Sequence, residues 1–145
     1  QKLYTYYIVI QPTDLLMFDL AYSMNNFKVS TPASQYAVSS GGIPNFRGDV
    51  YTWMATTSFA PTEKLSLYSS FEYSRAKNFD SYDYAGIPLG VDNRRYDTTV
   101  GVKYSLKDNI IIEPHYGYYS YRAYQSSDYG SYSAHVFWLD TKFTW

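Results

Sequence analysis

The sequence of 145 residues contains no cysteine. Without a thiol, the chain cannot form a disulfide, a thiolate metal site, an iron–sulfur cluster or a covalent haem attachment of its own. Charge is also sparse and nearly balanced, with 12 Lys and Arg against 13 Asp and Glu. The sequence therefore offers no basic surface for nucleic acid and no acidic tail, and we expect no nucleic-acid partner.

Long hydrophobic runs are absent as well. No stretch of about 18 apolar residues occurs, so the sequence predicts no transmembrane helix. No charged segment followed by an apolar one opens the chain, so we expect the numbering to begin after any signal peptide. The first residues, "QKLYTYYIVI", look like a strand that is already under way, which predicts a segment of something longer.

What the sequence does contain is tyrosine, at 19 positions, together with a repeated alternation of polar and apolar residues. In "YDTTVGVKYSL", for example, Val100 and Val102 alternate with Asp97 and Lys103. A period of two is typical of strands with two different faces. The pattern predicts an all-β antiparallel fold with seven strands, over roughly 2–11, 15–25, 49–60, 64–76, 94–106, 109–123 and 132–145.

The predicted connections alternate strictly between short and long. Short turns built from Pro, Asp, Asn and Thr lie near 11–14, 61–64 and 107–109. Long connections lie near 26–48, 77–93 and 124–131. All seven strands therefore belong to one segment, 1–145, built from hairpins.

Two environments could impose this alternation: the core of a soluble sandwich, or the lipid around a transmembrane β-barrel. Three features favour the barrel. Several predicted strands reach 11 to 15 residues, and a tilted membrane crossing needs about 9 to 11. Tyr and Trp collect near strand ends, where they suit the headgroup layer. Short turns on one side and long loops on the other are typical of bacterial barrels.

The end of the chain strengthens this interpretation. The strand "FWLDTKFTW" is similar to the terminal strand of Gram-negative outer-membrane β-barrels, with Trp145 last and Phe143, Thr141, Leu139 and Phe137 at alternate positions before it. The whole chain resembles the C-terminal part of such a porin-like barrel. The resemblance implies a bacterial outer-membrane location, and a Trp145 that is both an interfacial anchor and a signal for the barrel-assembly machinery.

Strand parity gives a further expectation. If Trp145 ends in the periplasm, the short turns are periplasmic and the long loops extracellular. A barrel with both termini in the periplasm needs an even number of strands, so seven cannot close it alone. We expect about seven strands of a larger or multi-segment barrel, with the missing strands upstream or on another chain.

Parity also sorts side chains between lumen and lipid. Polar residues expected to face the lumen are Asp19, Glu72, Asp97, Lys103, Glu113, His115, Asp140 and Lys142. Residues expected to face lipid or the membrane interface are Phe18, Leu20, Tyr51, Trp53, Val100, Val102, Phe137, Leu139, Phe143 and Trp145.

Motifs for catalysis are missing. Glu113 and His115 resemble half of a metal or acid–base site, but the sequence supplies no further ligands, so we predict no metal site. A nucleophile elbow is absent, and the glycine-rich stretches lack the lysine of a phosphate loop. We expect no catalytic residues and no enzyme. Pro114 lies inside a predicted strand and predicts a bulge or a local edge.

A narrower resemblance concerns the sequences of the turns and of one long connection. The turns "APTEKLSL" and "SLKDNIII" and the stretch "GIPNFRGDVYT" look like the barrel component of porin–cytochrome electron conduits. The resemblance implies a channel or sheath around a multihaem cytochrome in transmembrane electron transfer. Haem would then belong to the partner, and this chain would bind none. A general diffusion pore, or a barrel that mounts adhesin or enzyme loops, remains the alternative.

Overall fold

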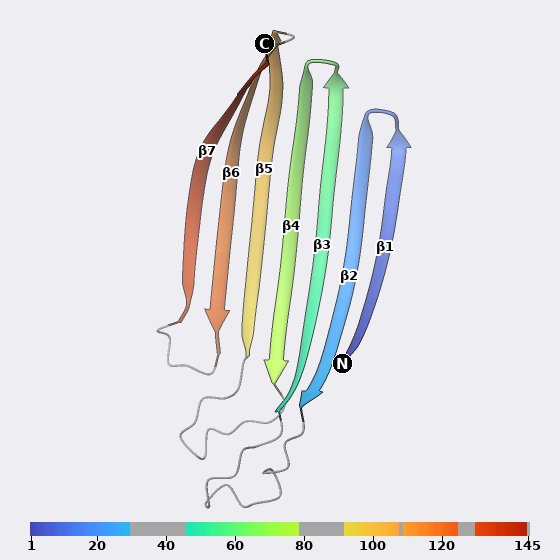
Figure 1. The fold of residues 1–145 in the computed structure, drawn as a ribbon, viewed down its shortest axis with the longest axis vertical. Helices are drawn as coiled ribbons and strands as arrows, with labels where there is room; N and C mark the ends of the chain where they lie inside the picture. The colour runs from blue at the N-terminus through green and yellow to red at the C-terminus, as the bar shows by residue number, and fades with distance from the viewer. Residues whose placement is uncertain (30–45, 79–91, 108, 125–129, 145) are drawn as a thin grey trace, which may run out of the picture.

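The computed structural model describes residues 1–29, 46–78, 92–107, 109–124 and 130–144. These residues form seven strands in a single antiparallel sheet, in which each strand pairs with its neighbours in sequence (Figure 1). The strands are β1 (Lys2–Thr13), β2 (Leu16–Val29), β3 (Phe46–Thr62), β4 (Leu65–Asn78), β5 (Asn93–Lys107), β6 (Ile110–Ala123) and β7 (Tyr132–Phe143). The prediction of an all-β antiparallel fold of seven strands is confirmed, and the described part of the chain contains no helix.

Several strands extend further than the side-chain pattern predicts. The strand predicted over 15–25 runs to Val29, and the one predicted to begin at 49 begins at Phe46. Val29 and Phe46 are partners in the same ladder. The backbone hydrogen bonds of a ladder do not depend on side-chain type, so pairing continues beyond the region of clean alternation.

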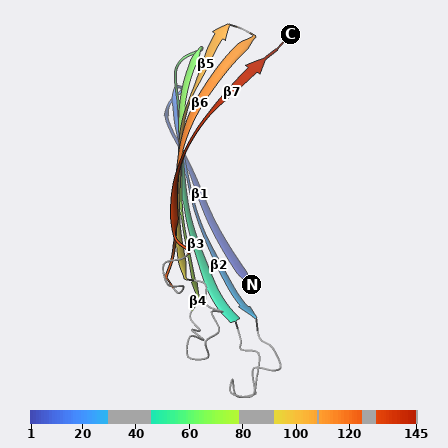
Figure 2. The ribbon, with the colours of Figure 1, turned by 90° about the vertical axis from the view of Figure 1, so that its left-hand side faces the viewer.

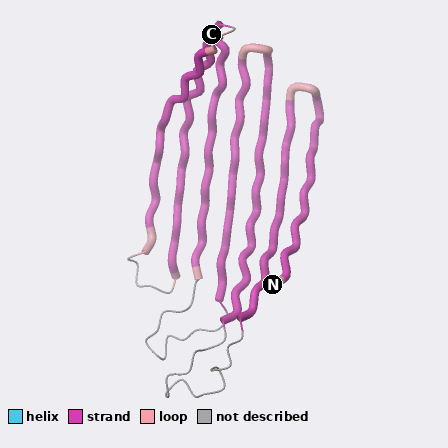
Figure 3. The backbone as a smooth tube through the Cα atoms, in the orientation of Figure 1, coloured by secondary structure: helices cyan, strands magenta, loops and turns pink. Residues whose placement is uncertain are grey.

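The two short turns that are described in full lie at the same end of the sheet (Figure 3). β1 and β2 are joined by Asp14 and Leu15, and β3 and β4 by Glu63 and Lys64. The predicted long connections fall largely outside the described residues, as does Trp145.

The sheet is open within the described residues. β1 and β7 form its two edges, and each pairs with one strand only. Because the number of strands is odd, the two edge strands run in the same direction (Figure 1). Seen from the side, the strands bow and fan apart at both ends, as the natural twist of strands requires (Figure 2).

A single layer of sheet leaves no room for a hydrophobic core. No hydrophobic side chain of the described residues is buried, and large apolar side chains such as Phe137, Leu139 and Phe143 are at least 60% exposed. A soluble sandwich would cover one face with a second sheet, and the described residues supply none. The apolar surface therefore needs a covering that these seven strands do not provide. No helix of the described chain could span a membrane.

Pro114 interrupts one ladder without inserting a residue. The β5–β6 register is the same on both sides of it, so the predicted bulge is not there. Val102 and Lys103, which lie opposite Pro114 and Glu113, do not pair with β6. This local loss of pairing is the alternative that the sequence predicted, because proline has no amide hydrogen to donate.

Candidate functional site

The register divides the sheet into two faces with different chemistry. Residues that pair across neighbouring strands project from the same side of a sheet, and Asp19, Thr56, Ser70 and Thr99 form one such series. Extending it by steps of two defines a polar face. This face holds all eight polar residues that the sequence assigns to a lumen: Asp19, Glu72, Asp97, Lys103, Glu113, His115, Asp140 and Lys142.

The opposite side, the apolar face, holds the residues that the sequence assigns to lipid. They are Phe18, Leu20, Tyr51, Trp53, Val100, Val102, Phe137, Leu139 and Phe143. Trp145, the tenth, lies outside the described residues. That this face meets lipid, and the other a lumen, stays a prediction.

A row of five aromatic side chains crosses the apolar face on strands β1 to β5. This aromatic row consists of Tyr6, Tyr22, Trp53, Tyr73 and Tyr96, which are successive ladder partners. The ring centroids of Tyr22 and Trp53 lie 4.3 Å apart, and those of Tyr73 and Tyr96 lie 4.9 Å apart. The row is closer to the long connections than to the short turns. The sequence predicted aromatic residues near strand ends but not their alignment, which requires the register.

Four further rows of the apolar face lie between the aromatic row and the short turns. They begin with the row of Leu20 and Phe71 and end with the row of Leu65 and Tyr104. Within the described residues these four rows contain no Lys, Arg, Asp or Glu, and His135 is their single ionisable group apart from tyrosines. The polar face behind them carries all the charge of this part of the sheet.

An apolar groove of about 600 Å³ opens beside the aromatic row. Its lining comes from β1 to β4 and includes Ile8, Leu20, Trp53, Ala55 and Phe71. Ala55 lies between Leu20 and Phe71 in the register, and its small side chain leaves the hollow that the larger neighbours surround. The surface that lines the groove is almost entirely apolar.

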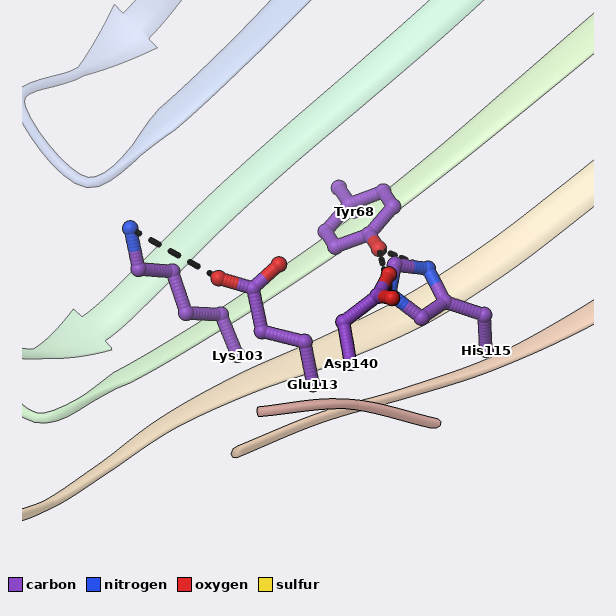
Figure 4. A network of polar contacts seen from close by, with 5 residues as sticks. All are labelled: Tyr68, Lys103, Glu113, His115 and Asp140. Atoms are coloured by element: carbon purple, nitrogen blue, oxygen red, sulfur yellow. Dashed lines mark hydrogen bonds and ion pairs between the residues drawn. The ribbon is translucent and has the colours of Figure 1, made fainter. Parts of the chain in front are cut away.

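The densest group of ionisable residues lies on the polar face, on β4 to β7 (Figure 4). His115 is its centre: its Nε2 lies 3.0 Å from a carboxylate oxygen of Asp140, and its Nδ1 is hydrogen-bonded to the Tyr68 hydroxyl. The imidazole stacks on Trp138, with centroids 4.7 Å apart and planes 6° apart. Close by, Lys103 Nζ lies 3.9 Å from Glu113 Oε1. We call the first four of these residues, His115, Asp140, Tyr68 and Trp138, the His115 network.

Gly101 makes this network possible. It is the ladder partner of both Tyr68 and His115, so it lies on the strand between them. Two strand spacings separate their backbones by roughly 10 Å, and the Tyr68 ring lies flat over Gly101 to cross that distance. A Cβ atom at position 101 would overlap the Tyr68 ring.

The central imidazole of the His115 network is held by its neighbours on both sides. Both imidazole nitrogens of His115 contact side chains of the polar face, those of Asp140 and Tyr68, and the His115 side chain is only 9% exposed. Each nitrogen therefore already has one partner within the sheet. The described residues contain no group of three or more His, Cys, Asp or Glu that could hold a metal. Glu113, the expected companion of His115, pairs with Lys103 instead.

The other predicted polar residues, Asp19, Glu72, Asp97 and Lys142, lie elsewhere on the same face. Asp19 accepts hydrogen bonds from the hydroxyls of Tyr7, at 2.8 Å, and Thr56, at 2.9 Å. Asp97 pairs with Arg95 and lies opposite Glu72. These contacts hold charges of both signs on the polar face.

Sequence analysis did not single out Tyr68, Trp138 or Arg95. The period of two could have identified them. Tyr68 is four residues from Glu72, Arg95 is two from Asp97, and Trp138 is two from Asp140, so each shares a face with a predicted residue. Their residue types drew no attention, since tyrosine is common in this chain and arginine is scattered through it.

Comparison of this chain with models of protein families, with curated proteins and with solved structures found no match. The function proposed below therefore depends on the two faces of the sheet and not on a related protein.

Proposed function

We propose that this chain forms part of the wall of a transmembrane β-barrel in a bacterial outer membrane. In this proposal the apolar face lies against lipid, and the polar face lines the lumen. One observation supports it above the others: four successive rows of one face hold no Lys, Arg, Asp or Glu within the described residues, whereas the other face holds six of them and His115 over the same length of the sheet. A charged side chain against the middle of a bilayer costs about 2 to 4 kcal/mol for Lys or Arg.

The dimensions of the uncharged region agree with a bilayer. On β4 it runs from Leu65 to Tyr73, the member of the aromatic row on this strand, over nine residues. A tilted strand crosses the hydrocarbon in about 9 to 11 residues. The aromatic row then falls at the boundary between hydrocarbon and headgroups, where rings with polar tips are favoured.

A wall of this kind makes a porin-like channel or a sheath, and it needs no catalytic residue. The charges of both signs on the polar face suit water or a polar protein surface in the lumen. The narrower proposal, a sheath for a multihaem cytochrome in electron transfer, depends on the resemblance in style alone. A diffusion pore, or a barrel that mounts functional loops, stays the alternative.

The proposal requires further strands beside β1 and β7. Unpaired backbone groups in hydrocarbon would each cost several kcal/mol, and the seven described strands leave both edges open. The additional strands would come from a longer chain or from a second chain.

Membrane dependence of folding tests this function. We expect the protein to acquire its strand content, measured by circular dichroism, only in detergent micelles or lipid vesicles, and to resist protease there. Folding as a monomer in plain buffer would contradict the proposal. The contents of the lumen need a second measurement: haem staining of a co-purified partner would support the sheath, and solute uptake into vesicles without any partner would support the pore.

A further inference from the structure

Three arginines lie side by side on the apolar face, one row beyond the aromatic row toward the long connections. Arg75 on β4 pairs with Arg94 on β5, and Arg94 pairs with Arg122 on β6. We call these residues the arginine row. Like charges directly opposite each other in a sheet repel, so this arrangement is unfavourable unless something negative lies against it.

The described residues neutralise the row only in part. One carboxylate lies within ion-pair distance of it in this part of the chain, that of Asp92, 3.7 Å from Arg75. The Tyr124 ring adds a weak contribution, with its centroid 5.9 Å from the Arg75 guanidinium carbon and 5.2 Å from that of Arg94. The Nε atoms of Arg75 and Arg94 are buried without a hydrogen-bond partner, and so is Asp92 Oδ1. Three guanidinium groups thus face one carboxylate.

Position narrows the choice of ligand. The uncharged rows would lie in hydrocarbon and the aromatic row at its boundary, so the next row outward falls in the headgroup layer. The anions of that layer are the phosphate groups of lipids. The planar guanidinium group binds phosphate with two parallel hydrogen bonds, which makes arginine the preferred residue for this contact.

We propose that the arginine row binds the phosphate group of a membrane lipid on the side of the long connections. This proposal rests on the proposed function, because it requires the apolar face to lie in a bilayer. It adds to that function a specific lipid contact, with a matching charge and a defined depth.

The chain supplies a matched control. Arg95 is the immediate neighbour of Arg94 but lies on the polar face, where it pairs with Asp97. Replacing Arg94 or Arg95 by Gln removes the same charge from the same strand. Only the first substitution removes it from the proposed headgroup site.

The test uses the full protein in phosphatidylcholine vesicles to which phosphatidic acid is added, with bound lipid counted by native mass spectrometry. We expect the wild type to retain phosphatidic acid in preference to phosphatidylcholine. Arg94→Gln should weaken this retention roughly fivefold, and joint replacement of all three arginines by Gln roughly a hundredfold. Arg95→Gln should change it by less than about twofold. Circular dichroism checks that each variant is folded. If the triple variant does not fold, the comparison of Arg94→Gln with the wild type tests the site.

Any one of five results would overturn the site. If folded Arg94→Gln retains as much phosphatidic acid as the wild type, the arginine row does not bind the lipid. If Arg94→Gln and Arg95→Gln lose equal amounts of phosphatidic acid, the retention depends on net charge and not on the row. Displacement of the lipid by millimolar inorganic phosphate would mean that the row binds soluble phosphate. Failure of the wild type to insert into any vesicle would overturn the proposed function together with this site, whereas insertion without a preference for phosphatidic acid would overturn the site alone.

Discussion

At the scale of single residues, the size of Gly101 decides what its neighbours can do. Tyr68 and His115 are 47 residues apart in sequence and two strands apart in the sheet, and they meet because no side chain stands between them. Gly117 is used in the same way, since a Cβ there would come within 2.7 Å of the Tyr119 ring. Glycine thus lets a large ring lie across the polar face.

Replacing Gly101 with Ala should break the contact between Tyr68 and His115. The new methyl group must push the Tyr68 ring aside, and the lost hydrogen bond should lower the free energy of unfolding by about 1 kcal/mol. Urea denaturation in vesicles measures this change. In a Tyr68→Phe background the same substitution should cost much less, because the bond is already absent.

Thr99→Ala provides the control for this prediction. Thr99 lies on the same strand and face, two residues from Gly101. If Gly101→Ala destabilises the protein equally with and without the Tyr68 hydroxyl, the network does not depend on that glycine.

At the scale of elements, the alternation of side chains was sufficient to sort residues between two faces. Val100 and Thr99 could be assigned to opposite sides from the sequence, because a strand has a period of two. The partners across strands could not be assigned, since they depend on register. The His115 network, the aromatic row and the arginine row all arise from register. Sequence analysis therefore found members of the first two, such as His115 and Trp53, but no member of the arginine row and none of the three groups as a group.

Strand ends were also beyond the sequence. β2 and β3 continue their ladder through Val29 and Phe46, beyond the strand ends predicted at 25 and 49. From the sequence we expected that seven strands cannot close a barrel alone. The described sheet is open at β1 and β7.

The edge strand β1 offers a test at this scale. Its side chains are exposed on both faces, and it has one ladder partner in the described sheet. Because an open edge in hydrocarbon is costly, we expect another strand to cover β1 in the membrane. Its amides should then exchange with deuterium as slowly as those of β4, which has neighbours on both sides.

Hydrogen exchange followed by mass spectrometry of β1 and β4 peptides measures this protection. Vesicles and denaturing detergent provide the folded and unfolded references. Fast exchange throughout β1 in a membrane-embedded protein would show an open edge and would contradict the expected closure.

At the scale of the whole molecule, the described residues form a single sheet with two unlike faces. The described strands leave no hydrophobic side chain buried, so the stability of this fold must come from what covers the apolar face. In the proposed function, lipid hydrocarbon would cover the four uncharged rows of this face. A protein partner on the same face would have to match these four uncharged rows.

The most direct measurement is the solvent exposure of alternate residues along β5. The chain has no cysteine, so single cysteines at positions 97, 98, 99, 100, 102 and 103 each take one spin label. In vesicles, collisions with oxygen report hydrocarbon, and collisions with a water-soluble nickel chelate report water. We expect labels at 98, 100 and 102 to favour oxygen, and labels at 97, 99 and 103 to favour nickel. Equal exposure to water on both faces, or alternation in the opposite phase, would contradict the account.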